Sequence, residues 1–264
     1  MLTRLLALPD VADLNVDSDD RIIRHSAVLA RKPMLREVFT EFHHLFRTLD
    51  ERYFGKTDGL RVEIGAGVAP VRDSYPDVLA TDVVAASHLD RTLDAQAMDL
   101  PDSSVRALYG QNCFHHFPQP DRFFSEVERV VAPGGGVILI EPYHGPVASL
   151  LYKRLFASEG FDKTMPGWEA PSDGPMNGAN QALSHIVFVR DRATFEARFP
   201  DLEIVHAEPL GNLMRYLLSG GLNFRQLVPD IGIPAIKAME WLVRPILPLL
   251  ALHHVIVLRH RWDR

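Results

Sequence analysis

The spacing of hydrophobic and polar residues changes near residue 60, and this change divides the chain into two parts. Between residues 20 and 53, apolar side chains recur at the spacing of an amphipathic helix. The stripe consists of Leu35, Val38, Phe39, Phe42 and Phe46. Pro33 is acceptable in a first helical turn, so the pattern predicts two helices. We expect residues 1–58 to form a helical N-terminal cover.

From residue 60 onward, short apolar runs alternate with helix-like segments such as 123–131. The runs are Leu60 to Ile64, Val78 to Val84, Ala107 to Tyr109 and Gly136 to Ile140. Such alternation is typical of parallel βαβ units, in which ligands bind at the carboxyl ends of the strands. "APGGG", residues 132–136, predicts a turn that leads into the next strand.

Two later segments break this rhythm and are expected to cover a binding site. Residues 145–181 contain a helix-like start followed by a long Gly-, Pro- and Asn-rich stretch, and loops of this length are usually functional. Residues 211–250 read as mainly helical. The pattern between and after them predicts a helix over 191–199 and strands in "LEIVHAE" and "HHVIVLRH". We call 145–181 and 211–250 the cap segments, inserted in a domain of residues 59–264.

Composition narrows the class of protein. The chain has 264 residues, 47% of them hydrophobic, with a net charge of −6 and scattered basic residues, which does not favour nucleic acid as a partner. The single cysteine, Cys113, excludes an internal disulfide and suits the cytoplasm. The start lacks the features of a secretory signal, and 245–258 is too short to span a membrane, although peripheral membrane contact stays open.

The first predicted strand runs into the glycine loop "RVEIGAGVAP", residues 61–70. A dinucleotide fingerprint needs three glycines, and here Pro70 stands where the third should be, after Gly65 and Gly67. Glu63 would also put an anion beside bound phosphates. A ligand with a positive charge reverses this argument, because Glu63 would then attract it. The loop therefore favours a cationic ligand over a pyrophosphate.

Two further acids follow the next two strands. Asp82 comes 17 residues after Gly65, where a carboxylate can accept hydrogen bonds from ribose hydroxyls. Asp94, in "DAQAMDLP", could accept a bond from an exocyclic amine, with Met98 as an apolar surface for a ring. Three acids at three successive strand ends predict a nucleoside with a cationic tail.

In order and spacing, "VEIGAG", "TDV", "DAQAMDLPDSS", "NCFHHF" and "ERVVAPGGGVILIEP" resemble class I S-adenosylmethionine-dependent methyltransferases, especially the branch that includes ubiquinone and menaquinone C-methyltransferases. The resemblance covers residues 60–142. It implies that Glu63 lies near the methionine end of the cofactor, that Asp82 binds the ribose and that Asp94 holds adenine. The cofactor site implied in this way consists of Glu63, Gly65, Gly67, Asp82, Val83, Asp94, Ala95 and Gln111, with Gly110 and Asn112 beside the donor methyl.

The chain departs from the family pattern at two positions. Ala69 replaces a glycine of the loop, which is a mild change. Val105 and Arg106 replace the usual Phe-Asp opening of the fourth strand, which leaves an orienting interaction unaccounted for.

Methyl transfer from a sulfonium requires alignment, exclusion of water and, for some acceptors, removal of a proton. His116 and His115, directly beyond the fourth strand, are the candidate bases, although such a pair can equally fix a loop. Two paired histidines without a third ligand do not predict a metal site.

Candidate substrate-binding residues come from the segment after the fifth strand. They are Glu141, Tyr143, His144 and Trp168, with Glu159, Asp162 and Asn180 as further candidates in the first cap segment. Packing and helix capping account for the same residues equally well. Cys113 is expected to be a small buried side chain.

Taken together, the sequence predicts an α/β fold: a Rossmann-like, mainly parallel seven-stranded sheet with helices on both faces, an N-terminal helical cover and cap insertions. The expected activity is S-adenosylmethionine-dependent methylation of a small-molecule, saccharide or lipid-linked acceptor, with O-methylation first and a quinone or small aromatic acceptor next. A catalytically silent cofactor-binding scaffold and a nicotinamide-dependent oxidoreductase are the alternatives. The oligomeric state stays open.

Overall fold

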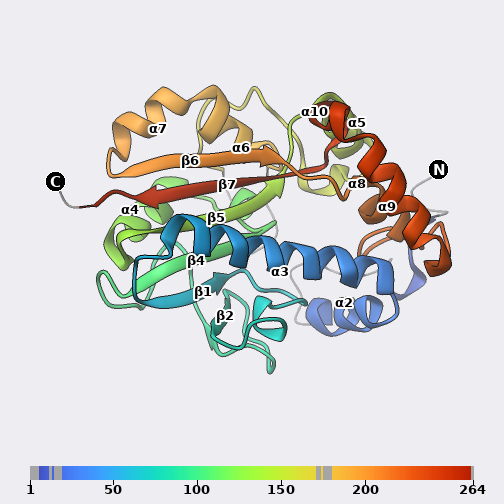
Figure 1. The fold of residues 1–264 in the computed structure, drawn as a ribbon, viewed down its shortest axis with the longest axis horizontal. Helices are drawn as coiled ribbons and strands as arrows, with labels where there is room; N and C mark the ends of the chain where they lie inside the picture. The colour runs from blue at the N-terminus through green and yellow to red at the C-terminus, as the bar shows by residue number, and fades with distance from the viewer. Residues whose placement is uncertain (1–5, 12–13, 15–19, 171–173, 175–179, 263–264) are drawn as a thin grey trace.

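The computed structural model describes residues 6–11, 14, 20–170, 174 and 180–262. Its centre is a seven-stranded sheet in the order β3-β2-β1-β4-β5-β7-β6 (Figure 1). The strands in that order are Arg91–Thr92, Val78–Asp82, Leu60–Ile64, Val105–Gln111, Val131–Pro142, His253–His260 and Leu202–Pro209. The first five are parallel to one another, whereas β7 is antiparallel to both β5 and β6. The predicted Rossmann-like, mainly parallel sheet is confirmed.

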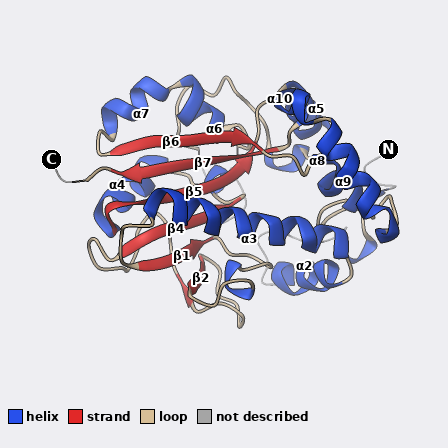
Figure 2. Cartoon of the chain, in the orientation of Figure 1, coloured by secondary structure: helices blue, strands red, loops and turns tan. Residues whose placement is uncertain are grey.

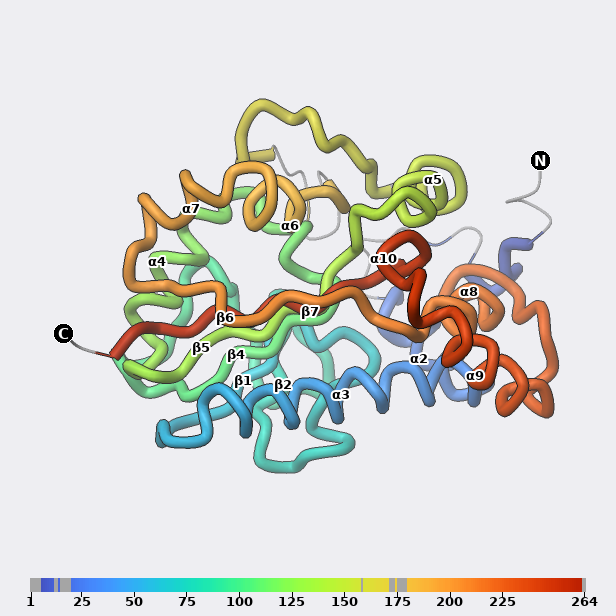
Figure 3. The backbone as a smooth tube through the Cα atoms, turned by 45° about the horizontal axis from the view of Figure 1, so that its top comes forward, coloured from blue at the N-terminus to red at the C-terminus, as the bar shows by residue number. Residues whose placement is uncertain are grey.

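Helices cover both faces of the sheet (Figure 2). On one face lies α3 (Pro33–Phe54), preceded by α2 (Asp20–Ala30); on the other lie α4 (Pro120–Val130), α6 (Leu183–His185) and α7 (Arg192–Arg198) (Figures 1 and 3). Along β5, Val137 and Leu139 pack on the α4 side, and Ile138 and Ile140 pack on the α3 side. Because both faces are covered, the strands are nearly continuous apolar runs.

The N-terminal stripe is the contact surface of α3. All five of its residues are buried against the sheet, and Leu35, Val38 and Phe46 are fully inaccessible. Phe46 stacks on Tyr109 of β4, with ring centroids 5.1 Å apart. Apolar burial of this extent is the main term that holds the helix on the sheet.

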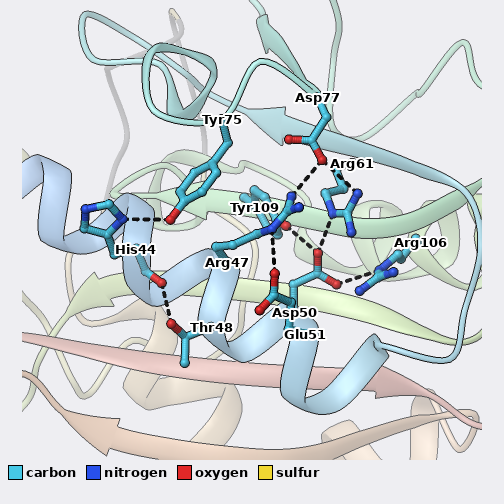
Figure 4. Close-up of polar contacts among 10 residues, drawn as sticks. All are labelled: His44, Arg47, Thr48, Asp50, Glu51, Arg61, Tyr75, Asp77, Arg106 and Tyr109. Atoms are coloured by element: carbon cyan, nitrogen blue, oxygen red, sulfur yellow. Dashed lines mark hydrogen bonds and ion pairs between the residues drawn. The ribbon is translucent and has the colours of Figure 1, made fainter.

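A buried carboxylate adds a polar anchor to the same contact. Asp50 of α3 is fully buried and accepts hydrogen bonds from Arg61 Nε at 2.6 Å, Arg106 Nε at 2.7 Å and the Tyr109 hydroxyl at 2.8 Å (Figure 4). This accounts for Arg106, the residue that departs from the family pattern, because its ionic partner comes from α3. Asp77 joins the edge of the network by bridging Arg61 and Arg47.

The glycines before the fifth strand do not form a separate turn. β5 begins at Val131, and its register against β4 shifts between Val105 and Ala107, so that Gly134 is taken into the strand at φ +84°. The predicted turn is therefore wrong: the extra residues form an irregularity inside a continuous strand.

Helix α5 (Pro146–Arg154) and the helices of the second cap segment gather at the carboxyl ends of the parallel strands, whereas the loop that carries Trp168 runs back over the face of α4 and α7 (Figure 3). The first cap segment contains α5 and the turn η4 (Ala157–Glu159), and part of it, 171–173 and 175–179, lies outside the described residues. The second contains α8 (Leu213–Ser219), η6 (Asp230–Gly232), α9 (Ile233–Leu242), η7 (Arg244–Ile246) and α10 (Leu247–Leu250). Among the described helices, none has the length and apolar character needed to cross a bilayer.

Asp50→Asn is expected to lower the free energy of unfolding by about 3 kcal/mol, because two guanidinium groups would lose the carboxylate that neutralises them in the interior. The matched control is Asp77→Asn, which alters the exposed edge of the same network and should cost less than about 1 kcal/mol. Urea unfolding at neutral pH measures both values. Equal losses in the two variants would contradict the anchoring role of Asp50.

Candidate functional site

A cavity of about 640 Å³ opens at the carboxyl ends of β1, β2 and β4, beneath the cap segments. All of the predicted cofactor-binding residues and both predicted catalytic histidines line it. They are Glu63, Gly65, Gly67, Asp82, Val83, Asp94, Ala95, Gln111, His115 and His116. The structure thus brings together residues that are spread over more than fifty positions of the chain.

The glycine loop has a backbone conformation that favours glycine, and little room for a side chain at its first glycine. Gly65 and Gly67 both have positive φ, at +65° and +53°, where residues with a side chain are strained. A Cβ atom on Gly65 would also lie 2.6 Å from Cys113 Cβ. Two features therefore require glycine at position 65: backbone conformation and close packing against the turn that follows β4.

Glu63 at the end of β1 is almost completely buried, and its Oε2 accepts a hydrogen bond from Val71 N at 2.7 Å. Burial raises the pKa of Glu63 to about 8, and the nearby carboxylates Asp73 and Asp82 push it in the same direction. The segment after the loop is only a three-residue turn, Val71–Asp73, instead of a long helix. This end of the cavity therefore lacks the helix N-terminus that phosphates prefer and offers a carboxylate to a cation.

Asp82 at the end of β2 is tied to the glycine loop. Its Oδ2 accepts from Gly67 N and its Oδ1 from Val84 N, each at 3.0 Å. A carboxylate oxygen has further lone pairs, so Asp82 can still accept bonds from a ligand. Asp94, beyond β3, is exposed and accepts from Gln96 N at 2.8 Å. Both acids are held in place by backbone donors at the rim of one cavity.

The turn after β4 is held by Glu141, a fully buried residue of β5. Glu141 Oε1 accepts from Cys113 N and Phe114 N, both at 2.9 Å, and Oε2 lies 2.6 Å from His115 Nδ1. The other ring nitrogen of His115, Nε2, lies 3.4 Å from Glu159 Oε2 in the first cap segment. Burial alone would lower the pKa of His115, but the carboxylates of Glu141 and Glu159 raise it to about 10.

None of the four predicted substrate-binding residues lines the cavity. Glu141 lies behind the turn and orients it. The rings of Tyr143 and His144 contact each other at a tilt of 52°, and His144 stacks with His185 at a centroid distance of 4.4 Å. Trp168 is buried beside Phe124 and donates from Nε1 to Asp191 at 3.0 Å, so it packs α4 against the cap.

Of the further candidates, only Glu159 lines the cavity. Asn180 instead ties the cap to itself, accepting from Asp162 N and donating to Asp162 O at 2.9 Å in both bonds. Cys113 is buried, and burial together with the carboxylate of Glu141 raises its pKa far above the usual value, so it is not a nucleophile.

Several aromatic residues that sequence reasoning missed line the outer part of the cavity. They are Tyr152, Phe156, Tyr216 and Phe224, accompanied by Gln181 and His253. Phe156 and Phe224 come from different cap segments and meet edge to face at 6.0 Å. Tyr216 and Phe224 had one signal in the sequence, "YLLSGGLNF", residues 216–224, which reads as a helix stopped by glycines.

The loop that carries Phe224 is fastened by a buried lysine. Lys32 Nζ donates to the carbonyl oxygens of Ser219, at 2.7 Å, Gly221, at 2.6 Å, and Phe224. Burial lowers the pKa of Lys32 to about 8. The N-terminal cover thus holds one wall of the cavity in place.

Comparison with known proteins agrees with this geometry. Residues 66–139 match the family model described as a methyltransferase domain. A phosphatidylethanolamine N-methyltransferase from Cereibacter sphaeroides is 27% identical over 132 residues, which cover 48% of this chain. The match spans about half the length of that relative, 53%.

Two solved structures share the fold at low sequence identity. The geranyl diphosphate C-methyltransferase of Streptomyces coelicolor A3(2) superposes with a TM-score of 0.51 at 13% identity, covering 97% of this chain and 89% of that one. The phosphoethanolamine N-methyltransferase 2 of Haemonchus contortus gives 0.50 at 11% identity, covering 96% and 60%. Both show the fold alone. By the family match over residues 66–139, together with the sheet order and the cavity at its strand ends, the chain carries a methyltransferase domain.

Proposed function

We propose that the cavity binds S-adenosylmethionine and that the protein transfers its methyl group to the hydroxyl oxygen of a small or lipid-linked acceptor. The observation that carries the proposal is that all eight cofactor residues inferred from sequence line one cavity. In this assignment Glu63 attracts the cationic methionine end, Asp82 accepts from the ribose, and Asp94 and Ala95 hold adenine.

The charge of this part of the cavity supports a cationic cofactor. Glu63, Asp82 and Asp94 lie at the ends of three neighbouring strand segments, and such a set attracts a sulfonium and an ammonium but repels the two phosphates of a nicotinamide dinucleotide. Arg106, whose departure from the family pattern left an orienting interaction unaccounted for, has a structural partner in Asp50. The oxidoreductase and scaffold alternatives therefore have no specific observation in their favour.

The acceptor is assigned to the outer part of the cavity. Its apolar surface is supplied by the aromatic residues of the cap, and its polar surface by His115, His116 and Glu159, which we call the histidine wall. Aromatic and aliphatic acceptors suit such a lining. The curated relative acts on a lipid by name, which supports an acceptor with an apolar part.

The reaction is an in-line displacement. The acceptor oxygen attacks the methyl carbon, the carbon–sulfur bond breaks, and S-adenosylhomocysteine leaves with the electron pair on sulfur. The hydroxyl proton must pass to a polar group, and His116 and Glu159 of the histidine wall are the candidates, because His115 already shares its protons with two carboxylates. The cap excludes water and aligns the acceptor, which supplies much of the rate in a reaction with an activated leaving group.

The proposal is tested by ligand-induced stabilisation of the purified chain. S-adenosylmethionine or S-adenosylhomocysteine at 100 times its dissociation constant should add about 2.7 kcal/mol to the free energy of unfolding. NAD should add nothing. Stabilisation by NAD alone would overturn the assignment, and release of S-adenosylhomocysteine with a panel of hydroxylated lipids, saccharides and phenols would identify the acceptor.

Asp82→Asn should weaken S-adenosylmethionine binding by roughly 10- to 100-fold, because charge-assisted bonds to the ribose and to the glycine loop are both lost. Calorimetric titration measures the change. Asp99→Asn, a fully exposed acid of the neighbouring loop, is the matched control and should bind normally. Unchanged affinity in Asp82→Asn would mean that the ribose lies elsewhere.

Binding should also depend on pH through Glu63. Its pKa is about 8 in the free protein, so the carboxyl is protonated at pH 6 to 7 and the incoming cation must displace that proton. The affinity for S-adenosylmethionine should therefore rise with pH, by up to about tenfold per unit, and level off above pH 8. Glu63→Gln should bind weakly with no such slope, and a slope retained in that variant would assign the proton to another group.

A further inference from the structure

The histidine wall brings together three side chains that can each bind a metal ion, whereas proton transfer needs only one base. It combines two imidazoles from the turn η3 (Phe114–His116) with a carboxylate from η4, and one ligand atom from each residue lies within 4.8 Å of the other two. The sequence predicted no metal here, because two adjacent histidines lack a third ligand. Folding supplies that ligand from Glu159, 44 residues beyond His115.

His115 is oriented as a metal-binding histidine is. Its Nδ1 lies 2.6 Å from Glu141, a fully buried carboxylate that is itself held by two backbone N–H groups. Histidines that bind metals commonly donate their other ring N–H to a carboxylate in this way, which fixes the tautomer and aims the free lone pair. When an ion displaces the proton on Nε2, the Nδ1 proton stays on the Glu141 side and the Nε2 lone pair points toward Glu159.

The spacing of the wall suits a small ion. Ligands at bonds of about 2.0 Å from a tetrahedral ion lie about 3.3 Å from one another. The separation of His115 Nε2 and Glu159 Oε2 is already 3.4 Å. The ring of His116 lies 4.3 Å from that of His115, centroid to centroid, and its ligand nitrogen lies within 4.8 Å of the other two ligand atoms, so binding an ion would draw the three closer together.

The charge balance also favours a divalent ion. Glu141 and Glu159 are two carboxylates on opposite nitrogens of one ring, and the side chain of Glu159 is 36% exposed to the cavity. With His115 protonated, the two carboxylates and the imidazolium together carry one negative charge. With a divalent ion and neutral imidazoles, the same residues and the ion together carry no net charge. An uncompensated charge in the interior is costly.

The donor set selects the kind of ion. Two imidazoles and one carboxylate favour first-row transition ions such as Zn²⁺, Mn²⁺ and Fe²⁺, whereas Mg²⁺ and Ca²⁺ prefer sites made of oxygen. Three protein ligands also leave at least one position open, as in catalytic sites. That position faces the cavity, because all three residues line it.

We propose that His115, His116 and Glu159 bind one divalent transition-metal ion in the acceptor part of the cavity, with Glu141 as the positioning residue behind His115. The ion would take an acceptor oxygen as a further ligand and hold it facing the donor methyl. The inference extends the proposed function, and its test is independent of turnover.

The test is metal binding to the full chain, prepared without a histidine tag and stripped with a chelator. Equilibrium dialysis against Zn²⁺ or Mn²⁺ in excess Mg²⁺, followed by elemental analysis, should give close to one ion per chain. Glu159→Gln and His116→Ala should each weaken Zn²⁺ binding by roughly tenfold or more, as should Glu141→Gln through loss of orientation.

The matched control is Glu208→Gln. Glu208 forms a histidine–glutamate pair with His206 on β6 at the same 3.4 Å separation, away from the cavity, and its loss should leave Zn²⁺ binding unchanged. Circular dichroism checks that each variant is folded. If Glu141→Gln does not fold, the partly exposed Glu159 carries the test.

Three outcomes would overturn the metal site: binding well below one ion, equal binding of Mg²⁺, or a Glu159→Gln variant that binds Zn²⁺ like the parent. Titration of the same samples with S-adenosylmethionine separates this inference from the proposed function. Cofactor binding without Zn²⁺ binding rejects the metal site alone, whereas failure to bind the cofactor rejects the methyltransferase assignment.

Discussion

The position of α3 along the sheet is fixed by one buried carboxylate. Asp50 pairs with both Arg61 of β1 and Arg106 of β4 and also accepts from Tyr109, so a single side chain joins the helix to two neighbouring strands. Apolar packing supplies most of the free energy of this contact, and the charged hydrogen bonds add a directional constraint on where the helix lies. At the other end of the same helix, Phe39 lines the cavity. Lys32, which directly precedes α3, binds the loop that carries Phe224. The position of this side of the cavity thus follows from that of α3.

Glu141 has the corresponding role inside the site. It is buried at the end of β5, where one of its oxygens accepts from two backbone N–H groups and the other is hydrogen-bonded to the His115 ring. The turn after β4 therefore has one arrangement, including Asn112 at φ +50°. The sequence predicts that Glu141 binds substrate, but in the structure it orients the turn after β4. Because its carboxylate is fully buried, it cannot contact an acceptor.

The part of the site formed by strand ends could be predicted, because the position of a residue at the end of a parallel strand follows from the strand period. Glu63, Asp82 and Asp94 were placed on one rim by this argument, and all three line the cavity. The acceptor side could not be predicted in the same way. Tyr143 and His144 follow β5 directly and Trp168 lies later in the first cap segment, but their side chains pack on His254, His185 and Phe124, which come from distant parts of the chain. For the same reason, the sequence does not reveal Glu159 as a partner of His115.

The turn predicted at Gly134 is wrong for a local reason, since a glycine with positive φ fits a strand irregularity as well as a turn.

The two sides of the cavity differ in what they can contribute to catalysis. Carboxylates that hold the ammonium and the ribose of a cofactor contact groups that do not change during methyl transfer, so they strengthen ground state and transition state equally and affect binding. Rate acceleration has to come from groups beside the reacting oxygen and carbon. Under the proposed function those groups are the histidine wall, in which Glu141 holds His115, and the aromatic residues of the cap, among which Lys32 holds Phe224. We therefore expect differences in acceptor among proteins with this fold to arise from the cap and from the turn after β4 more than from the strand ends.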